Sequence, residues 1–349
     1  MNFVNKRSTL SLDKIDFLKV FMMFVVVFGH CIALWLPDGW FNQSPKIPSP
    51  FLSYLIGWIN TFHIYAFTFA SGYLFYYVKY ERGGYDNYFT AIKGRVKRLL
   101  VPYAVVSLVW AIPVFVLFNG FNAKELVKRF LFATNPEQLW FLIMLFVVFC
   151  IFLIASNAIE KMSAPNIIAC CVIIYIIGVW IGPKVLPNIF QIWTSFRYVI
   201  FFYLGYRYRK GINIHFNPIV MITLSLGIYT LYYWLLKTDQ SIHLQRISLF
   251  FSCVIGCLSA VECVRSLSDC FIKSIVDTPV YKFFKMHNMT IYLIHQQIIY
   301  FVVNALNGKT TNTLMVVLSF FAGIGISSVF AIIISKFSVT RKIFGYEKY

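Results

Sequence analysis

Residues 15–36 read IDFLKVFMMFVVVFGHCIALWL, a stretch long enough to cross a bilayer as one helix. It carries Lys19 and His30, which a plain membrane anchor does not need. They are eleven residues apart, so they share a helix face and lie roughly 16 Å apart along the axis. Asp16, one turn before Lys19, can pair with it. Ionisable groups inside a membrane helix usually mark function. The alternative is a snorkelling lysine and a histidine bonded to a neighbouring helix.

Composition supports a polytopic membrane protein. The 349 residues are 59% hydrophobic and only 13% charged, whereas soluble proteins average about 25% charged residues. The net charge of +18 is largely explained by basic loops on the inner side of the membrane. We therefore expect membrane lipid as a partner and no nucleic acid. We expect no cleavable signal peptide, because the first apolar stretch is too long and lacks a small-residue cleavage site.

Motifs for several other kinds of site are missing from the sequence. The eight cysteines form no CxxC pair and lie mostly in apolar stretches, so they are expected to be small buried hydrophobic residues. The sequence contains no Gly-rich phosphate loop, no HExxH and no GxSxG. We expect no metal cofactor.

The apolar stretches predict an all-α fold of about ten transmembrane helices. A basic arm (1–14) precedes a single membrane domain (15–335), and a basic tail follows (336–349). The expected spans lie at about residues 15–36, 51–78, 99–118, 139–159, 166–181, 189–206, 216–236, 247–263, 288–305 and 314–335.

Charge distribution predicts that both termini are cytoplasmic. With the N-terminus inside, the inner segments carry 21 Lys and Arg residues and the outer loops carry 8, while Lys19 and Arg197 lie within spans. This bias follows the positive-inside rule.

Two histidines are the first candidates for chemistry. His30 can act as a general base or acid, and its position in an inside-to-outside span puts it in the outer half of the membrane. His63 should lie at similar depth in the next, antiparallel span, which suggests one site. Alternatively, His63 is an interfacial side chain bonded to backbone. Ser71 and Gly72 also interrupt this aromatic span, and Gly72 permits close helix approach.

Basic and polar residues further along the chain are the next candidates. Arg95 and Arg98, with Lys93 and Lys97, precede the third span on the inner side. They either anchor the chain and bind anionic lipid or hold a phosphate-bearing cofactor, for which arginine is well suited. Arg197, inside a span, needs a partner or a wet cavity.

Two more groups lie near the end of the chain. His295 lies beside two glutamines in the ninth span. Glu262 can pair with Arg265 and is expected to be structural.

Six collinear motifs make the chain resemble the acyltransferase-3 family of integral membrane acyltransferases, which includes bacterial polysaccharide O-acetyltransferases. In chain order they are Lys19 with His30, FHIYAFTFASGY ending at Tyr73, Arg95-x-x-Arg98 before LLVPY, LWFL with Trp140, Arg197 before FFYLGY, and IYLIH ending at His295. The family's first basic residue is commonly Arg. Lys19 keeps the charge but lacks the planar fork that clamps a carboxylate or phosphate.

The resemblance implies transfer of an acyl group, most often acetyl, from acetyl-CoA to a hydroxyl of a glycan or glycolipid at a bacterial inner membrane. His30 would deprotonate the acceptor or briefly carry the acyl group, with Lys19 and His63 as further catalytic residues. Arg95 and Arg98 would meet the CoA phosphates. Arg197, His295, Ser71 and Trp140 would contact substrate.

Two other functions fit a chain of this kind. One is a transporter or flippase for a lipid-linked sugar, although the sequence shows no two repeat halves. The other is a non-enzymatic partner in a glycan assembly complex.

Overall fold

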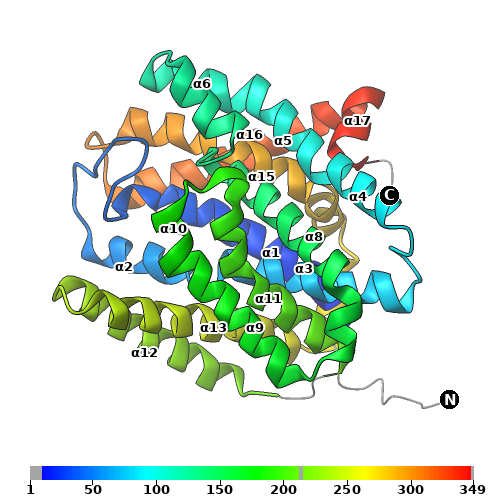
Figure 1. The fold of residues 1–349 in the computed structure, drawn as a ribbon. Helices are drawn as coiled ribbons and strands as arrows, with labels where there is room; N and C mark the ends of the chain where they lie inside the picture. The colour runs from blue at the N-terminus through cyan, green and yellow to red at the C-terminus, as the bar shows by residue number, and fades with distance from the viewer. Residues whose placement is uncertain (1–9, 212–214, 347–349) are drawn as a thin grey trace. The chain divides into compact units, whose positions relative to one another are not determined.

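A computed structural model describes residues 10–211 and 215–346 of the chain (Figure 1). In these residues the regular structure is helical, apart from an isolated bridge between Trp40 and Gln43. The α-helices are α1 (Leu12–Cys31), α2 (Pro50–Ile59), α3 (His63–Tyr76), α4 (Tyr88–Arg95), α5 (Val101–Val106), α6 (Ile112–Asn119), α7 (Ala123–Leu126), α8 (Trp140–Lys161), α9 (Ala164–Ile176), α10 (Gly182–Val185), α11 (Ile192–Lys210), α12 (Pro218–Lys237), α13 (Ile242–Ser266), α14 (Asp269–Val276), α15 (Pro279–Leu306), α16 (Asn312–Lys336) and α17 (Ser338–Phe344).

The chain folds into two compact units. One combines the residues up to Ala70 with Arg207–Phe330, and the other combines Ser71–Tyr206 with the residues from Ala331 onward. In the first unit α1 packs against α13, α14 and α15, and α12 runs beside α13 (Figure 1). In the second unit α8 packs against α4, and α17 packs against α5.

Seven helical stretches of the described chain are long and apolar enough to cross a membrane. They are Tyr88–Asn119, Glu137–Lys161, Ala164–Val185, Pro218–Lys237, Ile242–Ser266, Pro279–Leu306 and Asn312–Lys336. The other three of the ten expected spans differ in composition or continuity: α1 and α11 carry several charged residues, and the chain from 50 to 76 is divided into two helices. Length and composition alone therefore support seven spans.

Helix α1 begins with a capped turn and ends earlier than the sequence predicts. Ser11 accepts a hydrogen bond from the Lys14 N–H (3.2 Å), and Asp13 lies in the first turn, as expected at a helix N-terminus. The α-helix ends at Cys31, and a short 3₁₀ turn continues to Trp35. His30 therefore lies in the last turn of α1, where the next loop begins.

The expected span at 51–78 is broken between α2 and α3. At the break the Thr61 hydroxyl donates to the Trp58 carbonyl (2.7 Å), and the Phe62 N–H donates to the Ile59 carbonyl (3.1 Å). These local bonds satisfy polar groups that a membrane interior cannot solvate. Further along α3, Gly72 permits the predicted close approach, because a Cβ there would collide with the Phe202 carbonyl.

Two helices begin earlier than the sequence predicts. Asn87 caps a continuous helical stretch from Tyr88 to Asn119, so Arg95 and Arg98 lie on a helix rather than in a connector. This stretch contains π-helical segments at Val96–Leu100 and Ser107–Ala111. Helix α15 begins at Pro279, capped by the Thr278 hydroxyl, and it therefore includes Lys285, which precedes the predicted span at 288–305.

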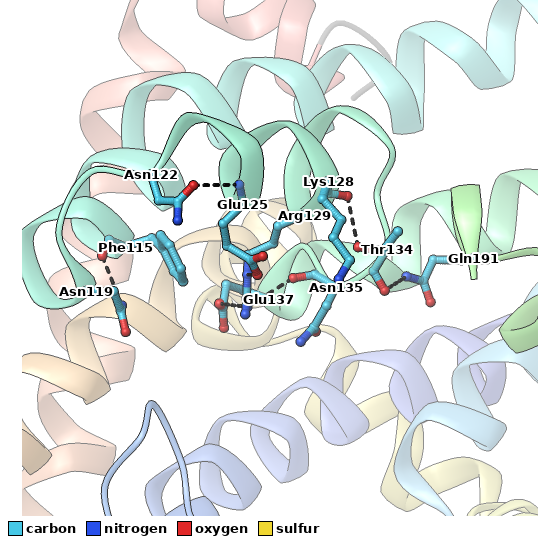
Figure 2. Close-up of polar contacts among 10 residues, drawn as sticks. All are labelled: Phe115, Asn119, Asn122, Glu125, Lys128, Arg129, Thr134, Asn135, Glu137 and Gln191. Atoms are coloured by element: carbon cyan, nitrogen blue, oxygen red, sulfur yellow. Dashed lines mark hydrogen bonds and ion pairs between the residues drawn. The ribbon is translucent and has the colours of Figure 1, made fainter. Parts of the chain in front are cut away.

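A network of charged residues fixes the start of α8 in the second unit (Figure 2). The Arg129 guanidinium donates to Glu137 (2.8 Å) and to the Asn135 carbonyl (3.2 Å), and it lies 3.4 Å from Glu125. Its other neighbour is the Phe115 ring, whose centroid is 4.6 Å away. Since Arg129 is partly buried and both carboxylates face it, we interpret this network as structural.

Candidate functional site

The last turn of α1 brings His30 against His295 of α15. His30 Nδ1 and His295 Nε2 are 2.7 Å apart, and the ring planes are inclined by 22°. His295 is fully buried, whereas His30 is half-buried. The sequence predicts a catalytic His30 and a separate substrate contact at His295, whereas the structure pairs the two directly.

The hydrogen bonds of this pair assign a tautomer to each neutral imidazole. His295 Nδ1 lies 3.0 Å from the Ile291 carbonyl, which can only accept, so Nδ1 carries the proton. A neutral imidazole has one N–H, so His295 Nε2 is the acceptor and His30 Nδ1 is the donor. His30 Nε2 is therefore left with a free lone pair, as a general base requires.

His63 lies near this pair and is held by backbone. Its Nδ1 donates to the Ile59 carbonyl (2.7 Å) at the break between α2 and α3, and its side chain is buried. Ile59, which accepts this bond, packs against Gly29, the residue before His30. The structure thus contains both features that the sequence left open, a backbone-bonded His63 and its proximity to His30.

A charged cluster lies toward the other end of α1. Asp16 Oδ1 is 3.6 Å from Lys19 Nζ, which confirms the predicted pair. Asp16 Oδ2 is 2.7 Å from Lys285 Nζ of α15. One carboxylate thus lies between two ammonium groups, so the cluster has a formal charge of +1.

Helices α1 and α15 therefore meet through polar contacts at two levels. The Asp16 cluster lies at one level and the His30–His295 pair at the other, with Lys19 three turns from His30 on the same face. The Asn288 amide of α15 also donates to the Lys19 carbonyl (3.3 Å). Lys285 also belongs to this interface, although no sequence motif marks it. The Thr278-Pro279 capping signal is the feature that places Lys285 on the helix.

Arg95 and Arg98 have different environments in the second unit. The Arg95 guanidinium donates to the Tyr85 hydroxyl (2.5 Å), and its centre lies 4.4 Å from the Phe149 ring centroid. Arg98 is exposed. The Arg95 guanidinium is thus engaged by other residues of the chain, whereas the Arg98 side chain is exposed.

The remaining predicted substrate residues also belong to the second unit. The Arg197 guanidinium donates to the Gly178 carbonyl (3.4 Å), which lies in a π-helical turn, so this arginine has the partner that its position requires. Trp140 is the first residue of α8, and its ring centroid is 5.7 Å from that of Tyr198. Ser71 is half-buried on α3. Their roles toward substrate stay predictions.

Glu262 has the structural role expected from the sequence. Its carboxylate pairs with Arg265 (2.5 Å) and accepts a hydrogen bond from the Tyr208 hydroxyl (3.2 Å). Within the described residues, no group of three or more His, Cys, Asp or Glu side chains is arranged to hold a metal ion.

Comparison with known proteins identifies the family. Neither the search of curated proteins nor the search of solved structures found a match. A family model described as an acyltransferase domain matches residues 12–335, which is nearly the whole chain and includes both histidines of the pair. The chain therefore belongs to the acyltransferase-3 family, whose members are membrane acyltransferases.

Proposed function

We propose that this protein is a membrane O-acyltransferase. It moves an acyl group, acetyl in the first instance, from acyl-CoA to a hydroxyl of a cell-surface polysaccharide or glycolipid precursor at a bacterial inner membrane. The observation that carries the proposal is the His30–His295 hydrogen bond, because it leaves a basic nitrogen on His30 in a chain of an acyltransferase family.

The proposed chemistry uses the lone pair on His30 Nε2. This nitrogen takes the proton from the acceptor hydroxyl while the oxygen attacks the thioester carbonyl. A C–O bond forms, the C–S bond breaks, and the CoA thiolate leaves and takes up the proton. His295 stabilises the imidazolium that forms and holds the ring in position, the task that a third group performs in hydrolytic triads.

Labelled acetyl-CoA tests this function with the purified full-length protein. An acyltransferase releases CoA thiol and transfers label to an envelope glycan. Transport of a lipid-linked sugar without thiol release would favour the flippase alternative. Binding to glycan assembly proteins with neither activity would favour the non-enzymatic alternative.

His295 is expected to act through His30. His295→Leu removes the acceptor of the His30 Nδ1–H, so kcat should fall about tenfold or more, since misplacing a catalytic group costs rate. His295→Gln supplies an amide oxygen as acceptor and should retain more activity. The pH dependence of kcat should also change in His295→Leu. If both variants lost the same fraction of kcat and the pH dependence of kcat stayed unchanged, His295 would have only a packing role.

Arg98 is proposed to bind the phosphates of the donor. Arg98→Gln should raise KM for acetyl-CoA about tenfold, the effect of losing a charge-assisted bond, with little change in acceptor KM. Lys161→Gln, which removes an exposed charge of α8 outside this basic cluster, is the matched control. Equal changes in both KM values would contradict donor binding. Because Arg95 contacts Tyr85 and Phe149, Arg95→Gln should also reduce stability.

Ten spans with both termini inside are proposed from the charge bias. Lys309 follows the α15 helix and is exposed, and the proposed topology places it outside. In a cysteine-free background, Lys309→Cys should react with an impermeant thiol reagent in intact cells. A cysteine at Lys161, which should face inside, is the matched control. Labelling of position 309 only after permeabilisation would contradict this orientation.

A further inference from the structure

The loop after α1 has a defined conformation beside His30. Trp40 and Gln43 exchange two backbone hydrogen bonds (2.9 and 3.0 Å), and the intervening Phe41 and Asn42 have φ values of 50° and 58°. Positive φ at both central residues is typical of a type I′ turn. A phenylalanine in this region is strained, and such strain persists only where the surrounding structure enforces it, often at functional sites.

Side chains of α15 and of Asn307, the residue that caps its C-terminus, fix this loop. The Gln43 amide donates to Asn304 (2.6 Å). Asn307 donates to the Ser44 carbonyl (3.0 Å) and accepts from the Lys46 N–H (2.9 Å). The loop is therefore attached to the same helix that carries His295.

The aromatic residues of the turn form a wall beside the catalytic imidazole. The Trp40 indole is nearly parallel to the His30 ring, with centroids 5.9 Å apart and planes inclined by 9°. Phe41 stacks on Tyr300 at 3.8 Å, and Trp40 meets Tyr300 edge to face at 5.8 Å. Trp40 and His30 are both half-buried, so part of this aromatic surface is accessible to a ligand.

We propose that Trp40 positions the acceptor, and that residues 37–47 form a binding subsite for a sugar ring next to His30. The inference rests on the proposed function. The flat indole presents an apolar face to the C–H face of a sugar ring. The Gln43 amide nitrogen donates to Asn304 and Tyr300, so its carbonyl oxygen is the group that can accept a hydrogen bond from a hydroxyl of the same sugar. One hydroxyl of the bound ring is thereby directed to His30 Nε2.

Ring and open-chain acceptors distinguish this role. The probes are the methyl glycosides of glucose, galactose and N-acetylglucosamine, with glycerol as an acyclic acceptor of the same hydroxyl chemistry. In Trp40→Ala, kcat/KM for a glycoside should fall about tenfold, which is near the upper end of what an aromatic contact contributes. Transfer to glycerol and KM for acetyl-CoA should change little. Trp40→Phe should retain most of the glycoside activity.

A matched control removes an indole elsewhere. Trp234 of α12 is 54% exposed, and Trp234→Ala should leave every constant unchanged. A Trp40→Ala loss of equal size for glycosides and glycerol would overturn the proposal, because it would show that Trp40 only supports His30. Unchanged glycoside kinetics would also overturn it.

Binding without donor separates this inference from the proposed function. Calorimetry without donor should show a weaker affinity for methyl glycosides in both variants. The loss of affinity should be larger in Trp40→Ala than in Trp40→Phe, as for kcat/KM. If the wild-type protein binds glycosides through Trp40 but never releases thiol from acetyl-CoA, the acyltransferase proposal fails and the subsite stands. If neither Trp40 variant changes the affinity for glycosides, the proposed sugar subsite is wrong.

Discussion

Replacing His30 by glutamine is expected to lower turnover by at least about 10²-fold, the usual contribution of a general base. Glutamine can still donate a hydrogen bond to His295, so α1 and α15 should remain joined by a hydrogen bond at this position. It cannot take a proton from the acceptor hydroxyl. The measurement is transfer of label from acetyl-CoA at saturating donor, with KM for acetyl-CoA determined separately and expected to stay similar.

The His30 experiment needs a check on protein quality. His243 is an exposed histidine on α13, and His243→Gln is the matched control that should keep full activity. Both variants should be extracted from membranes at wild-type amounts. Full acylation by a well-expressed His30→Gln protein would remove His30 from catalysis and leave it as a bonded histidine between two helices.

The sequence predicted the contacts within α1 correctly, because residues on one helix are related by a fixed local spacing. The spacing of Lys19 and His30 and the pairing of Asp16 with Lys19 both depend on residues within one helix. The contact of His30 with His295 depends on which helices pack together, and two residues so far apart in sequence give no spacing rule for that. His295 was therefore predicted as a separate substrate contact.

Other features were missed for identifiable physical reasons. Trp40 lies in a stretch that looks like an ordinary Pro-rich loop, and its type I′ turn has Phe41-Asn42 where Asn-Gly is the usual signal. The break at residues 60–62 contains neither Gly nor Pro. The early start of α15 had a readable signal in Thr278-Pro279, which the charge of the following segment obscured.

Lys19→Ala is expected to lower turnover about tenfold, the effect of losing one charge-assisted contact at the start of α1. Lys19→Arg should retain much of the activity because it keeps the charge. The structure sharpens this comparison. Asp16 is closer to Lys285 (2.7 Å) than to Lys19 (3.6 Å), so Lys19→Ala leaves Asp16 paired. The cost of an unpaired carboxylate should therefore not obscure the kinetic effect.

Lys285→Ala is the informative counterpart, because it also lowers the formal charge of the cluster from +1 to zero. It removes the shorter ion pair, so it should destabilise the protein more than Lys19→Ala, as measured by the thermal unfolding midpoint. If net charge near this end of α1 matters, both alanine variants should lose turnover. If the position of the charge matters, only Lys19→Ala should lose it. Normal turnover in well-expressed Lys19→Ala would show that the cluster serves only to join α1 to α15.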